Sequence, residues 1–229
     1  RKLISSNSGG VYGWWGMSFA FAPDGRLAYA RPDGIGLVDQ DGGYLKPLLN
    51  ITPLNTYSDW AWIPPIVWGA DGNSLYFVSH APAPAPITGE ESPYFDLSAL
   101  SFSGEAAVSL VNSAGMFSYP AVSSIESNGK KKSFQVAYLQ SIFVDQSDTS
   151  RYRLIVMDRD GSNSRELFPP ADKNGIEPQS PAWAPAEVVG QVGDFIAITY
   201  QGNLWLVDSG NSNTYQVTGD GLITKIDWK

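Results

Sequence analysis

Short apolar runs, each closed by turn-forming residues, recur along the chain and predict its elements. Between the turns, residues are apolar throughout or alternate with polar ones, as in Leu75 to Val78 and Phe195 to Tyr200. Runs of this length and period are typical of β-strands, and no stretch shows the 3.6-residue period of an amphipathic helix. The pattern therefore predicts an all-β protein.

Two signatures recur in a fixed order and define a repeat. The first is an apolar strand followed by a turn, at Phe19 to Gly25, Ile66 to Gly72 and, in weaker form, Pro181 to Pro185. Pro120 to Ser124 is a degenerate copy, and a further copy begins at Ile226-Asp227-Trp228. The second signature is a strand that ends in a turn with Asp and Gly, at Gly36 to Gly42, Leu154 to Gly161 and Leu204 to Gly210. Each repeat thus holds four strands joined by hairpin turns.

The spacing of these repeats predicts the architecture. The inner strands centre on Phe21, Trp68, Val122, Trp183 and Trp228, at intervals of about 45 to 60 residues, near the period of a four-stranded propeller blade. Such a sheet has two apolar faces and needs neighbours on both, so several sheets must pack around an axis. We expect a β-propeller of four-stranded antiparallel blades, with four complete blades and a partial fifth. The expected bounds are an N-terminal segment 1–17, blades 18–62, 63–115, 116–176 and 177–221, and an inner strand at 222–229.

The repeat resembles a known family. Phe or Trp before a Pro-Asp-Gly turn, as at Phe21 to Gly25, then an apolar strand and a strand end such as Val156 to Gly161, is similar to the TolB-type (WD40-like, PD40) repeat. The resemblance covers residues 18–228. It implies a propeller and an extracytoplasmic location (periplasmic, secreted or cell-surface), and it indicates that the chain is a portion of a larger protein. As a guide to function such a fold is weak.

Composition and charge narrow the classes of partner. The 229 residues are enough for one domain, and a net charge of -8 opposes binding to a nucleic acid backbone. The chain has no cysteine, which excludes disulfides and thiolate metal sites. No apolar run is long enough to cross a bilayer, so no transmembrane segment is expected in this fragment.

Aromatic residues collect in the connections that lead into the inner strands. In a four-stranded antiparallel blade these connections share one face with the turns between second and third strands, and loops on a rigid scaffold are where function usually lies. Aromatic side chains give a large contact area at little entropic cost, so the candidate ligand-binding residues are the following set with one acid among them. They are Trp14, Trp15, Tyr57, Asp59, Trp60, Trp62 and Tyr119. Packing between blades is the competing interpretation, and it is the stronger one for Trp68, Trp183 and Trp228.

Catalytic and metal-binding patterns are sparse. His80 is the only histidine and lies next to a proline-rich loop, and no Gly-x-Ser-x-Gly elbow is present, so a Ser-His-Asp triad is not expected. One histidine and no cysteine also leave too few ligands for a zinc site. We therefore expect a non-catalytic module without cofactor or metal that binds protein or peptide at the aromatic loop face. The alternative is a carbohydrate-binding propeller, or a glycoside hydrolase with acids drawn from Asp59, Glu177 and Asp227. A purely structural role as a spacer stays open.

Overall fold

The computed structural model describes residues 16–39, 41–42, 44–102, 106–128, 131–185 and 194–228. In these ranges the elements are β-strands, apart from two 3-10 turns at Gly89–Glu91 and Val144–Gln146. The expected all-β class is confirmed. No helix in the described ranges is long enough to cross a membrane. The chain divides into two compact units, Arg1–Ser113 (unit 1) and Ala114–Lys229 (unit 2).

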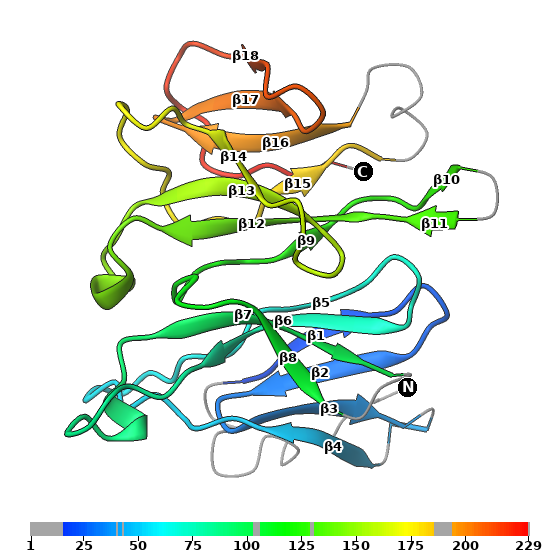
Figure 1. Cartoon of the computed structure of the whole chain (residues 1–229), viewed down its shortest axis with the longest axis vertical. Helices are drawn as coiled ribbons and strands as arrows, with labels where there is room; N and C mark the ends of the chain where they lie inside the picture. The colour runs from blue at the N-terminus through cyan, green and yellow to red at the C-terminus, as the bar shows by residue number, and fades with distance from the viewer. Residues whose placement is uncertain are drawn as a thin grey trace. The chain divides into compact units, whose positions relative to one another are not determined.

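Unit 1 holds two four-stranded antiparallel sheets (Figure 1). Both follow the chain order, so each strand pairs with the one before it through a hairpin or a longer connection. The first sheet contains β1 (Ser18–Phe21), β2 (Leu27–Arg31), β3 (Gly34–Val38) and β4 (Leu45–Asn50). The second contains β5 (Ile66–Trp68), β6 (Ser74–His80), β7 (Phe95–Ser101) and β8 (Ala107–Val111).

Unit 2 repeats this arrangement with one insertion. Its sheets have the orders β14-β13-β12-β9 and β15-β16-β17-β18, and a separate hairpin of β10 (Glu126–Asn128) and β11 (Lys131–Ser133) follows β9. The first sheet contains β9 (Ala121–Val122), β12 (Gln135–Ser141), β13 (Tyr152–Asp158) and β14 (Arg165–Phe168). The second contains β15 (Ala182–Trp183), β16 (Phe195–Tyr200), β17 (Asn203–Asp208) and β18 (Thr214–Gln216).

The predicted turn signatures close hairpins. Gly25 lies between β1 and β2 with a φ of 88°, a left-handed conformation that favours glycine. Its N–H donates to the Ala22 carbonyl at 2.9 Å, and Ala22 N–H donates to the Arg26 carbonyl at 2.8 Å. At Asp158 to Gly161 the Gly161 N–H donates back to the Asp158 carbonyl at 2.9 Å between β13 and β14. These turns all lie at one end of their sheets.

Within each unit, a tryptophan on the innermost strand of one sheet reaches the innermost strand of the other. Trp68 on β5 donates its indole N–H to the Ala20 carbonyl on β1 at 3.0 Å. Trp183 on β15 donates in the same way to the Ala121 carbonyl on β9 at 3.1 Å. The structure thus assigns both tryptophans to packing between sheets. The third repeat has Val122 at this position, and a valine cannot donate such a bond.

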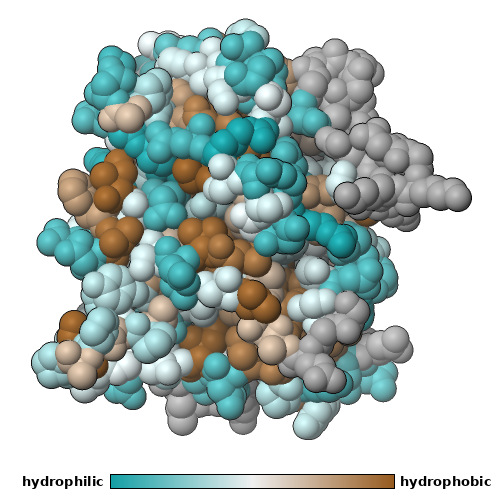
Figure 2. Space-filling model, in the orientation of Figure 1, coloured by the Kyte–Doolittle hydropathy of each residue, from teal (hydrophilic) through white to brown (hydrophobic). Residues whose placement is uncertain are grey.

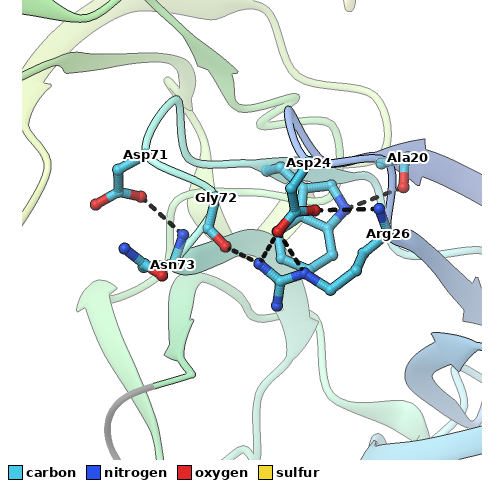
Figure 3. A network of polar contacts seen from close by, with 7 residues as sticks. Ala20, Asp24, Arg26, Asp71, Gly72 and Asn73 are labelled. Carbon is cyan, nitrogen blue, oxygen red and sulfur yellow. Dashed lines mark hydrogen bonds and ion pairs between the residues drawn. The ribbon is translucent and has the colours of Figure 1, made fainter.

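An arginine strengthens this contact in unit 1 (Figure 3). The Arg26 guanidinium lies over the Trp68 ring at 4.8 Å and the Phe102 ring at 5.2 Å, and those two rings stack at 5.0 Å. Arg26 also donates to the Gly72 carbonyl of the neighbouring sheet and, through Nε, to the Asp24 carboxylate at 2.8 Å. The hydrogen bonds that the Arg26 side chain and backbone N–H donate to the Asp24 carboxylate hold the pKa of Asp24 below its usual value. The first turn of one sheet is therefore tied to the first turn of the next.

Each unit has its own apolar core. In unit 1, Ala28, Ala30 and Ile35 of the first sheet pack with Leu75 and Phe77 of the second. In unit 2 the core is built in the same way, with larger side chains from both sheets: Leu139, Tyr152, Leu154, Val156, Phe168, Ile196, Ile198 and Val207. Burial of this kind stabilises by about 25 cal/mol per Å² of apolar surface removed from water. A single sheet could not achieve it.

The partial fifth blade is not confirmed. Residues 222–228 form no strand, and Ile223 N–H makes one backbone hydrogen bond, to the Gly202 carbonyl at 2.7 Å. A strand requires a ladder of such bonds along a partner, which this segment lacks among the described residues. Phe21 also differs from the tryptophans with which it aligns, because its ring is 68% exposed.

We predict that Trp68→Phe lowers the free energy of unfolding by about 1–3 kcal/mol, because the Ala20 carbonyl loses its donor and Arg26 loses part of the ring beneath it. Urea unfolding followed by circular dichroism measures the change. Trp60→Phe, at a site 46% exposed, is the matched control and should shift stability by less than about 0.5 kcal/mol. Equal losses in the two variants would contradict the role given to the indole N–H.

Candidate functional site

The aromatic loop, residues 51–65 between β4 and β5, is held in shape by its own hydrogen bonds. Thr56 Oγ1 donates to the Trp60 carbonyl at 2.6 Å, and Tyr57 N–H donates to Asn55 Oδ1 at 3.1 Å. Tyr57 has a φ of 50°, an unusual backbone conformation for a bulky residue. Such conformations persist where the surroundings enforce them, and they are common at binding sites.

A second loop, residues 81–94 between β6 and β7, braces the first. Asn55 N–H donates to the Glu90 carbonyl at 2.8 Å, and the Tyr57 hydroxyl donates to the Glu91 carboxylate. Donation to that carboxylate is the main reason why the pKa of Tyr57 is raised. The two loops therefore form one connected surface at the end of the second sheet.

A buried histidine joins the bases of the two loops. His80 Nδ1 lies 3.0 Å from the Thr52 carbonyl oxygen, and Nε2 lies 2.8 Å from the Ser92 carbonyl oxygen. A neutral imidazole has a single N–H and can donate to only one of them. The His80 ring stacks on the Phe95 ring with their centroids 5.0 Å apart. Trp62 contacts the same Phe95 ring edge-on, with the centroids 4.9 Å apart.

The sequence-predicted site residues fall into three groups. Tyr57 is 76% exposed and Trp60 46% exposed, and Asp59 lies exposed between them, so the structure brings these three together in the aromatic loop. Trp62 is in the same loop but only 4% exposed, where it supports the loop from below. Tyr119 belongs to unit 2.

Tyr119 and the two remaining candidates are not part of the aromatic loop in sequence. Tyr119 is half-buried and stacks on Phe117 with ring centroids 6.0 Å apart, and burial raises the pKa of its hydroxyl. Trp14 and Trp15 lie outside the described residues. Of the acids considered for hydrolysis besides Asp59, Glu177 forms an ion pair with Arg151 in unit 2. Among the described residues no group of three or more acids or histidines could hold a metal ion.

A groove of about 1010 Å³ opens in unit 2, at the loop end of its two sheets. Most of its lining comes from the β12–β13 and β14–β15 connections, the β16–β17 turn and the segment after β18, and the adjoining ends of β13 and β16 complete it. In this unit apolar residues, brown in Figure 2, reach the surface near the β12–β13 connection, where Phe143 is 62% exposed. We call this the unit 2 groove.

Sequence reasoning missed the unit 2 groove because a close backbone approach creates it. A Cβ on Gly175 would lie 2.6 Å from Arg151 Cβ and 2.6 Å from Ile142 Cδ1. The glycine lets the β14–β15 connection lie against the start of β13, where Ile176 and Tyr152 exchange two backbone hydrogen bonds of 2.8 and 3.0 Å. The only sequence signal for the groove was a lone glycine, Gly175, in a polar connection, and a glycine does not indicate which segment will pack against it.

Comparisons with known proteins identify the fold but no family. No family model matches the chain, and no curated protein matches it either. A structure of a nidogen/laminin complex is similar with a TM-score of 0.51 and 12% identity, over 86% of this chain and 60% of the other. A TolB-like protein from Agrobacterium tumefaciens is similar with a TM-score of 0.50 and 14% identity, over 88% of this chain and 65% of the other. These likenesses show the β-propeller fold, and the chain spans about 60 to 65% of the length of these two structures.

The expectation that the chain is not an enzyme is corrected by the same comparison. Structures with this type of fold include a gluconolactonase from Xanthomonas campestris, with a TM-score of 0.48 and 13% identity over 87% of this chain and 60% of the other. An oligogalacturonate lyase and an α-L-arabinofuranosidase from Clostridium thermocellum are also among them. The expectation is wrong, because this fold also occurs in enzymes and does not indicate a non-enzyme.

We predict that His80→Ala loosens both loops, because the Thr52 and Ser92 carbonyls lose the imidazole that links them and the ring leaves a cavity beside Phe95. Amide hydrogen exchange in residues 51–62 and 81–94 should rise at least about tenfold, equivalent to about 1.4 kcal/mol of local stability. Exchange in β12 and β13 of unit 2 is the internal reference and should not change. Unaltered exchange in the two loops would contradict the clamping role of His80.

We predict that Gly175→Ala destabilises the protein by about 1–3 kcal/mol, since the new methyl group must displace Arg151 or Ile142. Thermal or urea unfolding measures the loss. Gly89→Ala is the matched control, because a Cβ there would meet only Thr52 Cγ2 at an ordinary 3.5 Å. If both variants are equally stable, Gly175 is not required for the close approach.

Proposed function

We propose that this chain is a binding module that recognises a protein or peptide segment through the aromatic loop of unit 1. The observation that carries the proposal is the rigid presentation of two aromatic side chains, Tyr57 and Trp60, to solvent. Both side chains are exposed, and exposed aromatic side chains on a braced loop resemble the anchors of protein interfaces. Because the loop is already ordered, little conformational entropy is lost on binding.

The charge around the two rings favours a partner with basic residues. Asp59, Glu90 and Glu91 are all exposed in the two loops that carry or brace the rings. Carboxylates accept hydrogen bonds from Lys and Arg, and a cation over a Tyr or Trp face gains about 0.5–1 kcal/mol at an exposed site. The net charge of -8 also draws a basic partner toward the chain.

Carbohydrate is the competing ligand, since the faces of Tyr57 and Trp60 also suit sugar rings. A hydrolase would further need Asp59 to act with a second acid. The protein or peptide reading is preferred because the acids around the rings match basic side chains, which a neutral sugar lacks. An extracytoplasmic site of action, as the TolB-type resemblance implies, is part of the proposal.

The test uses a phage-displayed library of random peptides selected against the whole chain. Selected peptides should be rich in Lys or Arg beside an apolar residue, and Tyr57→Ala or Trp60→Ala should weaken their binding about 30-fold, corresponding to about 2 kcal/mol for an interface anchor. Titration by fluorescence anisotropy measures the affinities. Tyr44→Ala is the matched control, because Tyr44 is 65% exposed and lies in the β3–β4 turn at the opposite end of its sheet.

A glycan array distinguishes the competing ligand. Glycan binding that disappears in Trp60→Ala, without peptide binding, would replace the proposal with a carbohydrate-binding function. Glycoside hydrolysis that disappears in Asp59→Asn would make the chain an enzyme. A loss of peptide binding in Tyr44→Ala as large as in Trp60→Ala would show that the aromatic loop is not the site.

A further inference from the structure

The unit 2 groove has a charge opposite to that of the whole chain. Its lining includes four basic side chains and one acidic side chain, Glu177, although the chain carries a net charge of -8. The basic residues are Arg151, Arg153, Lys173 and Lys225. A concentration of cations in a concave surface attracts anions more strongly than the same charges spread over a convex one.

Two of the four basic side chains, Arg153 and Arg151, are bonded to neighbouring groups of the groove wall. Arg153 donates to the carbonyls of Pro169 and Pro170 at 2.8 and 2.7 Å, and to two further carbonyls of the same connection. Its guanidinium therefore shapes the wall of the groove, and its nearest carboxylate, Glu166, lies 4.0 Å from Nε. Arg151 pairs with Glu177. These contacts fix two positive charges in place at the rim.

The two lysines are available to a ligand. The Lys173 side chain is 60% exposed and lies 3.1 Å from the Asp172 carboxylate, which is 70% exposed, so solvent weakens the pairing. Lys225 makes no ion pair within the described part of the chain, and it lies in the segment after β18. Both are long and flexible, so they can reach carboxylates at more than one position along the groove.

The floor of the groove is preformed. The Gln179 side chain bonds to both backbone groups of Thr199, with its amide donating to the carbonyl at 2.7 Å and its oxygen accepting from the N–H at 2.7 Å. Ile223 N–H donates to the Gly202 carbonyl at 2.7 Å and holds the opposite wall. A ligand therefore enters a surface that needs little rearrangement, which favours affinity.

Apolar side chains line the groove together with the charges and favour one class of ligand. Ile142 is 37% exposed and Phe143 62% exposed on one wall, and Ile223 and Ile226 lie on another. Branched aliphatic side chains pack against the side chains of a peptide, whereas sugar rings need flat aromatic faces. Tyr200, the other aromatic residue of the lining, is only 9% exposed.

We propose that the unit 2 groove binds an extended peptide segment in which carboxylate side chains alternate with apolar ones. The site lies in a different unit from the aromatic loop and selects the opposite charge. It therefore goes beyond the proposed function and does not depend on it.

The probe is a fluorescein-labelled decapeptide of alternating Asp and Leu, titrated with the whole chain and followed by anisotropy. We expect saturable binding that weakens at high ionic strength, and no binding of the alternating Lys and Leu peptide. An alternating Asp and Ser peptide should bind more weakly, because it lacks the apolar half of the contact. Lys225→Glu and Lys173→Glu should each weaken binding of the Asp and Leu peptide at least about tenfold.

Arg159→Glu is the matched control. It makes the same change of charge in the same unit, in the exposed β13–β14 turn at the opposite end of the sheet, and should alter the affinity by less than about twofold. Equal weakening by Arg159→Glu would mean that net charge alone governs binding and would overturn the proposal. Absence of peptide binding would overturn it as well. If a tetramer of uronic acid binds and the peptide does not, the ligand is an acidic carbohydrate instead.

These results are separable from those for the aromatic loop. Tyr57→Ala and Trp60→Ala should leave binding of the Asp and Leu peptide unchanged, and Lys225→Glu should leave binding of the basic peptides unchanged. Loss of both activities in a single-loop variant would show that the two sites are one.

Discussion

The structure depends on the contact between the innermost strands of neighbouring sheets. A four-stranded sheet has two apolar faces, so its stability comes from the sheet beside it more than from its own ladder of hydrogen bonds. The indole N–H of Trp68 and of Trp183 makes this contact directional, because each donates to one carbonyl on the adjacent inner strand. In unit 1, Arg26 adds a cation over the same ring and a bond to the next turn. In unit 1 the residues of the turn and the packing tryptophan therefore stabilise the same contact between sheets.

This contact explains why the connections at one end of each sheet can vary in length and sequence. The tight turns and their ties are at the end that holds Gly25 and Asp24, so the fold requires little of the connections at the other end. Those connections include the long segments 51–65, 81–94 and 142–151. They are nevertheless ordered by side-chain bonds such as those of His80 and Thr56. Binding surfaces with low conformational entropy can therefore be built there without disturbing the cores.

The fold could be predicted from sequence because its signals are local. A strand, a turn with Asp and Gly, and an inner-strand tryptophan lie within a few residues of one another, and the hairpins formed where the turn residues require them. The interpretation of Trp68 and Trp183 as packing residues agrees with their indole bonds. The predicted strand at residues 222–229 is not confirmed over 222–228, because strand formation depends on a partner edge, which the apolar pattern of that segment does not specify.

The candidate sites were less predictable because burial is decided by residues far away in sequence. Trp60 and Trp62 are the same residue type and lie two positions apart in one loop, yet only Trp62 is buried. Phe95 and the loop that His80 holds cover it. The aromatic content of the loop predicted a binding surface but could not distinguish the exposed aromatic residues from the buried ones. The unit 2 groove was missed for the same reason, since Arg151, Lys173 and Lys225 come from three separate connections and Gly175 lets two of these connections approach each other.

The local charge of each surface matters more than the net charge of the chain. At physiological ionic strength, charges further apart than about 8 Å are largely screened from one another. A ligand in the unit 2 groove therefore responds to Lys173 and Lys225 far more than to the acids elsewhere, and a ligand on the aromatic loop responds to Asp59, Glu90 and Glu91. An acidic chain can in this way carry a cationic groove without contradiction.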